Sequence, residues 1–198
     1  MMLSDATRDR ILAHGLGIAS RAGWHALSFG DLARDLDLPK SGLARHFATK
    51  DELQLAVLDQ AAQLFIRDVN DVAAGESQGA TRLRTLFWRW LNWSRAPRLK
   101  GGCPFVHASA ESEALPPAVR ARLKEVLDAW SAVLREAIDA ARGQTIATDT
   151  DADQLIFELH GLYLSHHFWH WSMRDPTAEA RTMRAFDRIV SSPSRTGR

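Results

Sequence analysis

The chain has 198 residues, with 25 Lys and Arg against 24 Asp and Glu, 45% hydrophobic residues and one cysteine. These proportions exclude a disordered or collagen-like chain, and the length suits one large domain or one domain with a small appendage. A single cysteine cannot form an internal disulfide, so Cys103 fits a reducing compartment and we expect a cytoplasmic protein. The apolar runs are far shorter than the roughly 20 residues that a membrane span needs, so no membrane partner is expected.

Apolar residues recur at three- and four-residue spacing almost throughout, which predicts an all-α fold of about nine helices. The first helix is expected over 5–22, with Gly23 as its stop. Gly15 and Gly17 inside it indicate either close packing against a neighbouring element or a weak helix. A short second helix, capped by Ser28, follows over 29–36.

The next segment contains a break and then a strong helix start. Leu38-Pro39 forces the break, because the residue before a proline avoids the helical region, and a short helix over 40–47 follows. Thr49 and Glu52 form a capping box that opens a long helix. The predicted inner side of that helix carries Leu53, Val57, Leu64, Phe65 and Val72.

The second half of the chain has fewer interruptions. A polar loop over 75–79 is the best candidate for a boundary, and a small, polar tail over 191–198 is expected to fray. The predicted helices between them cover 81–94, 117–142 and 151–173, with a last one ending near Val190.

The two short helices, with a helix before and after them, form a helix-turn-helix pattern. Its second helix must be exposed enough to enter a major groove while its inner face stays anchored. From Leu38 to Lys50 the sequence has three cations and no acid, although the formal net charge of the whole chain is only +1. The expected anchor residues are Leu32, Ala33, Leu38, Leu43 and Phe47.

Several short motifs in this part of the chain form a specific combination. They are Ile11-Leu12, Gly23, Leu27-Ser28-Phe29, Leu32-Ala33 and the run from Leu38 to Leu53. Over residues 7–58 this combination resembles the tetracycline-repressor family of transcription regulators. Two later runs, 101–105 and 157–161, are similar to the C-terminal domain of one subgroup.

The resemblance implies a homodimer that reads a palindromic operator in double-stranded DNA and responds to a small-molecule effector. It implies that Lys50 meets a phosphate at a helix start and that Ser28 lies beside the DNA backbone. The family often has an aromatic residue where this chain has Ala44, so a contact to the DNA backbone is missing or is supplied by a neighbouring residue. The alanine can still contact the methyl group of a thymine. The implied DNA-facing residues are Ser28, Lys40, Ser41, Gly42, Ala44, Arg45, His46 and Lys50.

The resemblance also implies three parts: a helix-turn-helix domain over 1–50, a ligand-binding and dimerisation domain over 51–190, and the tail. Aromatic-lined cavities with a few polar groups are the usual small-molecule sites, although the same side chains can simply fill a core. The candidate pocket residues are Trp88, Trp93, Phe105, His107, Trp130, Tyr163 and His167. The candidate dimer residues, on the last two helices, are Leu155, Leu159, Leu162, His166, Trp169, Met183, Phe186, Ile189 and Val190.

Three patterns leave other functions open. Trp88, Trp90 and Trp93 lie among arginines, which suits a stacking platform for single-stranded nucleic acid, or the buried face of an amphipathic helix. His166 and His170 are one helical turn apart and can chelate a metal, but the sequence lacks the glutamate of an HExxH motif. Cys103 with a histidine can form a nucleophile pair, or lie in a turn. A regulator with no cofactor, no metal and no catalytic activity remains the favoured prediction.

Overall fold

The computed structural model describes residues 2–76 and 78–191, and within them it contains nine α-helices and no strand. The predicted all-α fold class is therefore confirmed. The chain forms two compact units: unit 1 covers residues 1–64 and 94–126, and unit 2 covers residues 65–93 and 127–198. Of the predicted tail, only Ser191 lies among the described residues.

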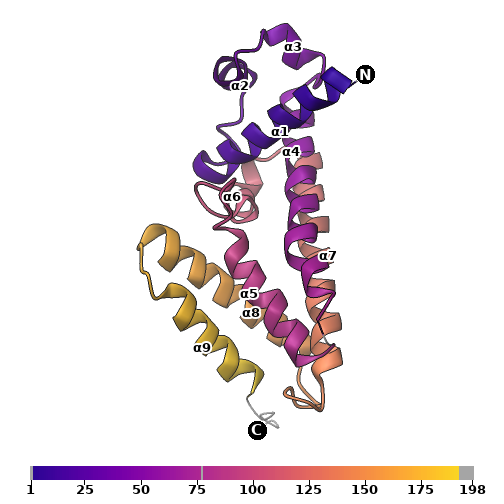
Figure 1. Ribbon diagram of the computed structural model, residues 1–198, viewed down its shortest axis with the longest axis vertical. Helices are drawn as coiled ribbons and strands as arrows, with labels where there is room; N and C mark the ends of the chain where they lie inside the picture. Colours follow the sequence, from indigo (N-terminus) through magenta and orange to yellow (C-terminus); the bar gives the residue numbers. More distant parts are fainter. Residues whose placement is uncertain (1, 77, 192–198) are drawn as a thin grey trace. The chain divides into compact units, whose positions relative to one another are not determined.

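Unit 1 contains the predicted helix-turn-helix. Its helices are α1 (Met2–Ala22), α2 (Phe29–Leu36), α3 (Lys40–Ala44), α4 (Lys50–Phe65, except its last residue), α6 (Pro104–Ala110) and the first part of α7 (Pro117–Ala141). Helix α1 packs against α2 and α6, and α2 packs against α3 (Figure 1). The core of the unit contains Ile11, Leu16, Trp24, Leu27, Leu32, Leu43, Phe47 and Leu53.

The local signals in unit 1 act as predicted. Helix α1 ends before Gly23, whose φ of 87° is readily adopted only by glycine. The Oγ atom of Ser28 caps α2 by accepting a hydrogen bond from the Asp31 amide at 3.1 Å. The Thr49 hydroxyl accepts a hydrogen bond from the Glu52 amide at 3.1 Å, and the Glu52 carboxylate accepts one from the Ala48 amide at 2.7 Å. Each cap uses groups only a few residues apart, which is why sequence could predict it.

Two helices of unit 1, α3 and α6, differ from prediction. Helix α3 ends at Ala44, not at 47, because the amides of His46 and Phe47 both bond to the Leu43 carbonyl in a turn that brings the Phe47 ring into the core. A short helix, α6, lies in a region where none was predicted; Pro104 is its first residue, where a missing N–H costs nothing.

Unit 2 begins with Phe65, the last residue of α4, and a π-helix over Ile66–Asp71 follows directly. This wider turn shifts the helical phase, so Val69 and Ala73 are fully buried while Val72 is 46% exposed. The prediction that Val72 continues the inner side of the long helix is therefore wrong. A regular helical period cannot anticipate the extra residue.

The other helices of unit 2 are α5 (Ala80–Trp93), α8 (Ala152–His167), α9 (Ala178–Val190) and the second part of α7. Helix α8 continues as a π-helix over Phe168–Ser172, so the predicted helix over 151–173 has two parts. Helix α8 packs against α5 and lies side by side with α9 in a helical hairpin (Figure 1). None of the helices among the described residues is both long and apolar enough to cross a membrane.

Candidate functional site

The exposed side of α3 carries the predicted DNA-facing residues. Leu43 and Phe47 are buried and anchor the helix, and the predicted anchors Leu32 and Ala33 are buried too. Lys40, Ser41, Ala44 and Arg45 are exposed, and Gly42 and His46 are half-buried. The helix is therefore held by its inner side and presents cations and small side chains outward, as groove entry requires.

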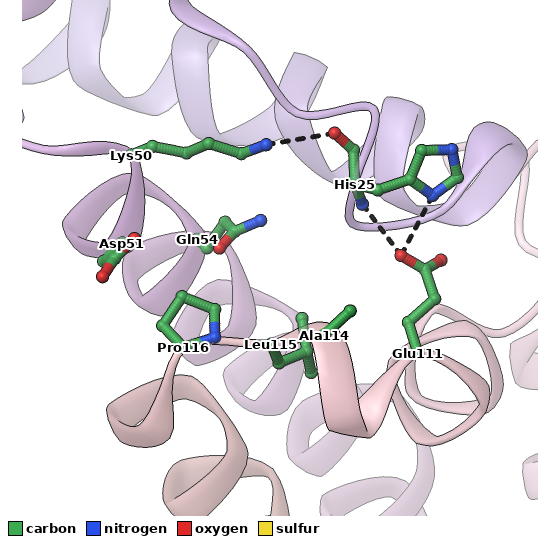
Figure 2. A pocket seen from close by; sticks show the side chains of 8 residues that line it. All are labelled: His25, Lys50, Asp51, Gln54, Glu111, Ala114, Leu115 and Pro116. Carbon is green, nitrogen blue, oxygen red and sulfur yellow. Dashed lines mark hydrogen bonds and ion pairs between the residues drawn. The ribbon is translucent and has the colours of Figure 1, made fainter.

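Lys50 and Ser28 lie at the N-termini of the helices that flank this surface. Lys50 is the first residue of α4, and its Nζ donates a hydrogen bond to the His25 carbonyl at 3.1 Å (Figure 2). The Ser28 hydroxyl, besides capping α2, donates to the Asp31 carboxylate at 2.6 Å. The hydrogen bond from the Ser28 hydroxyl, followed by the contact with the Arg34 guanidinium, lowers the pKa of Asp31. Asp31 is thus an acid beside the proposed DNA surface, with Arg34 to offset its charge.

The turn before α2 is held by a side chain that no local sequence pattern indicates. Glu111, at the end of α6, accepts hydrogen bonds from the amides of Trp24 at 3.1 Å and His25 at 2.8 Å. It also contacts the Nδ1 atom of the His25 ring at 3.0 Å (Figure 2). Burial opposes ionisation of Glu111, but the hydrogen bonds from His25 and Trp24 outweigh it, so the pKa of Glu111 is lowered.

His25, Lys50 and Glu111 border a hollow of about 220 Å³ in unit 1. Polar groups come from the start of α4 and from the turn, and apolar groups come from the segment that precedes α7 (Figure 2). The lining residues are His25, Lys50, Asp51, Gln54, Glu111, Ala114, Leu115 and Pro116. The hollow therefore combines the proposed phosphate-binding lysine with the groups that hold it.

Unit 2 brings several predicted pocket residues into one aromatic cluster. Trp130 lies edge-on to Phe65 at 4.9 Å and to Trp90 at 5.2 Å between ring centroids. Tyr163 stacks on Trp90 at 4.3 Å, and Trp93 lies edge-on to Phe65 at 5.4 Å. The Trp130 Nε1 atom is buried and makes no hydrogen bond to any described residue. A buried donor without an acceptor costs free energy in the absence of a ligand.

A histidine completes this cluster. The His160 ring lies edge-on to Trp90 at 4.8 Å, and its Nε2 atom is 3.5 Å from the Ser131 hydroxyl. Burial lowers the pKa of His160, which favours the neutral imidazole. The cluster therefore offers aromatic faces, an uncharged imidazole and an indole donor.

The remaining predicted pocket residues lie elsewhere. Phe105 and His107 belong to unit 1, where Phe105 is buried and His107 Nε2 lies 3.4 Å from the Gly101 carbonyl. Trp88 is 42% exposed, and its Nε1 donates to Glu179 at 3.1 Å at the edge of a shallow surface hollow. His167 is half-buried at the end of α8.

The predicted dimer residues divide into two groups. Leu155, Leu159, His166 and Phe186 are at most 3% exposed and pack inside their own unit. This side of α8 and α9 therefore faces the interior of unit 2, and the role of these residues in a dimer stays a prediction. Leu162, Met183, Ile189 and Val190 are half-buried, and Trp169 is 40% exposed beneath the Arg181 guanidinium. The most exposed apolar side chains on α8 and the following turn are instead Phe157, Leu164, Phe168 and Met173.

The alternative functions gain no geometric support. Trp90 and Trp93 are buried, so only Trp88 of the three tryptophans could stack on a nucleic-acid base. The rings of His166 and His170 stack on each other at 5.6 Å, and among the described residues no group of three or more His, Cys, Asp or Glu could hold a metal. Cys103 is buried immediately before α6.

Comparison with known proteins decides the family. Residues 79–186 match the model described as "Tetracyclin repressor-like, C-terminal domain", and residues 11–57 match "Bacterial regulatory proteins, tetR family". The chain belongs to the tetracycline-repressor family. The family assignment agrees with the resemblance seen in the sequence, and it makes this protein a transcriptional regulator with a helix-turn-helix.

Solved structures of other proteins share the fold. A TetR transcriptional regulator from Chloroflexus aurantiacus J-10-FL has 25% identity and a TM-score of 0.85, covering 97% of this chain and 98% of its own. AibR, in complex with isovaleryl coenzyme A and operator DNA, has 19% identity and a TM-score of 0.72, covering 94% and 99%. A regulator from Saccharomonospora viridis in complex with choline has 20% identity and a TM-score of 0.75, covering 94% and 96%. A search of curated proteins gave no significant match.

Proposed function

We propose that this TetR-family regulator is a homodimeric repressor that binds a palindromic operator and releases it when a small-molecule effector binds. The outward side of α3 carries the DNA-binding part of the proposal. Lys40, Ala44 and Arg45 are exposed there while Leu43 is fully buried, so the helix can enter a groove without losing its anchor. AibR, which shares the fold, has been solved with operator DNA.

Each proposed DNA contact has a distinct chemical role. Lys40 and Arg45 can reach phosphates or guanine edges, while Ser41, Gly42 and His46 lie on or beside the same surface. Ala44 offers only a methyl group, which suits the methyl of a thymine. Lys50 and Ser28 would contact phosphates at the ends of the flanking helices.

The proposed dimer interface is the exposed apolar stripe of α8. Phe157, Leu164 and Phe168 are 73%, 53% and 51% exposed, and they repeat at helical spacing along one side. Gly161 lies on the same side, and a Cβ added there would meet nothing within 4 Å. A second copy is the proposed occupant, because a palindrome requires two equivalent recognition helices.

The proposed effector site is the aromatic cluster of unit 2. Trp90, Trp130 and Tyr163 supply ring faces, and the buried Trp130 Nε1 supplies a donor that a ligand oxygen or nitrogen can accept from. The effector must bind more tightly to the form of the dimer that does not fit the operator, since a ligand that binds both forms equally shifts nothing.

The test is selection of bound fragments from a pool of random double-stranded DNA. We expect enrichment of an inverted repeat whose half-site centres lie about one helical turn, roughly 10 base pairs, apart. A pool with no enriched repeat after several rounds, from protein that is folded, would overturn the proposed function.

A further inference from the structure

The dipeptide Trp24-His25, between α1 and α2, has all its backbone polar groups bonded to side chains from α4 and from the C-terminal cap of α6. Glu111, the C-terminal cap residue of α6, accepts hydrogen bonds from both amides, at 3.1 and 2.8 Å. Gln54 of α4 donates to the Trp24 carbonyl at 2.9 Å, and Lys50 of α4 donates to the His25 carbonyl at 3.1 Å. One short turn thus connects the end of α6 to the start of α4 within unit 1 (Figure 2).

The Glu111 carboxylate is built into this turn. Its side chain is 21% exposed, and the carboxylate is engaged by Trp24 and by the amide and ring of His25. Gly23 leaves the space for it, because a Cβ added to Gly23 would lie 2.1 Å from Glu111 Oε1. The carboxylate is therefore the fixed partner that orients the turn.

The orientation of the turn determines where the Lys50 ammonium lies. The His25 amide and carbonyl belong to the same residue, so holding the amide on Glu111 fixes the carbonyl that Lys50 uses. An ammonium has three N–H donors, so two remain for another acceptor after one bonds to this carbonyl. A lysine side chain held in one place loses less conformational freedom when it binds a phosphate.

We infer that Glu111 is a positioning residue for DNA binding, which acts through the His25 backbone to place the Lys50 ammonium for a phosphate contact. This inference rests on the proposed function, since it needs Lys50 to meet DNA. It predicts that neutralising Glu111 changes the DNA affinity in the opposite direction from the loss of charge alone. A carboxylate close to DNA repels it, so removal of the Glu111 charge alone should strengthen binding, whereas loss of the positioning contact should weaken it.

The experiment measures binding of the full-length protein to a labelled random-sequence duplex of about 30 base pairs, long enough for two half-sites one turn apart. Glu111→Gln is compared with Lys50→Ala, with the double variant, and with Glu113→Gln. Glu113 is a matched control, because it lies two residues away, its side chain is 94% exposed, and the substitution removes the same charge. Circular dichroism establishes that each variant is folded.

We expect Lys50→Ala to weaken binding and to reduce the salt dependence by about one counterion per bound subunit. Glu111→Gln should weaken binding roughly threefold to tenfold in wild type, since contacting residues act non-additively. In the Lys50→Ala background, where only the charge effect remains, it should leave binding unchanged or slightly stronger. Glu113→Gln should leave binding unchanged or slightly stronger. A purely structural role for Glu111 would give the same loss with and without Lys50, and this result would overturn the inference.

The failures of the two proposals are distinguishable. If wild-type protein shows no salt-dependent binding to duplex DNA, the proposed function fails. If it binds and Lys50→Ala weakens binding, but Glu111→Gln behaves like Glu113→Gln, only the inference fails. Should Glu111→Gln not fold, Glu111→Asp repeats the cycle: it keeps the charge and shortens the side chain by one methylene, so we expect weaker binding only when Lys50 is present.

Discussion

The indole nitrogen of Trp24 donates a 2.8 Å hydrogen bond to the Pro104 carbonyl, 80 residues away in the chain. Trp24 is completely buried, and the carbonyl belongs to the first residue of α6. This bond and the Glu111 carboxylate fix α6 to the segment that leads into the helix-turn-helix. Unit 1 is therefore held together by contacts between residues that are distant in sequence.

Substitution of Trp24 with phenylalanine should destabilise the protein strongly. It leaves the Pro104 carbonyl without its donor and a cavity beside the smaller ring, so we expect a loss of about 2–3 kcal/mol. Urea unfolding at pH 7 measures this loss. Trp88→Phe is the control, because Trp88 is exposed and bonds to Glu179 at the surface. The control should change the free energy of unfolding by no more than about 0.5 kcal/mol, which is the usual range for a surface substitution.

Gly101→Ala should prevent normal packing of unit 1. An ideal Cβ at Gly101 would lie 2.3 Å from both the Ser20 carbonyl oxygen and the Arg21 Cα, which are backbone atoms that cannot turn aside. We expect a loss of more than about 3 kcal/mol or an unfolded protein. Gly17→Ala is the matched control within α1: its nearest neighbour would be 3.9 Å away, and helix propensity favours alanine by up to about 1 kcal/mol. Thermal unfolding of the two variants should therefore shift in opposite directions.

The contribution of Glu111 to stability should depend on pH. Its pKa is lowered in the folded protein from the ordinary value of 4.5, so the ionised carboxylate stabilises the fold above that pH, and this stabilisation is lost as the pH falls through the folded pKa. The difference in unfolding free energy between wild type and Glu111→Gln should be constant from neutral pH to about pH 5.5 and shrink below 4.5. A difference that grows on acidification would contradict the assigned direction.

The exposed stripe of α8 gives a prediction for assembly. Leu164→Glu places a charge in the middle of the proposed dimer interface and should convert dimers to monomers, as measured by light scattering after size exclusion. Ala132→Glu adds the same charge at an exposed position of α7 and should leave the mass unchanged. Equal masses for Leu164→Glu and wild type would exclude this stripe as the interface.

Substitution of Trp130 should affect effector binding more than it affects the free energy of unfolding. Trp130→Phe removes a buried N–H that lacks an acceptor among the described residues, so it loses no hydrogen bond there, and the cavity beside the smaller ring should be its main cost; without ligand we expect a smaller loss of stability than for Trp24→Phe. Compounds that raise the melting temperature of wild type in a screen should lose this effect in Trp130→Phe and keep it in Trp88→Phe. If the two variants respond alike, the aromatic cluster is not the effector site.

The sequence by itself determined the helical class, the helix-turn-helix and the caps at Ser28 and Thr49, and it carried the family resemblance. These features depend on groups within a few residues of one another, so the local pattern is sufficient. It also indicated which side of the helix-turn-helix is anchored, because Leu43 and Phe47 repeat at helical spacing.

Only the tertiary structure decided the rest. No local pattern links Glu111 to Trp24 and His25, which lie 87 and 86 residues earlier in the chain. Val72 faces outward because a π-helix changes the helical phase before it. Helix α8 has apolar side chains almost all round, so its sequence could not show that Leu159 faces the core while Leu164 faces outward. Which apolar side of a helix is buried depends on the elements that pack against it, and for α8 those are α5 and α9.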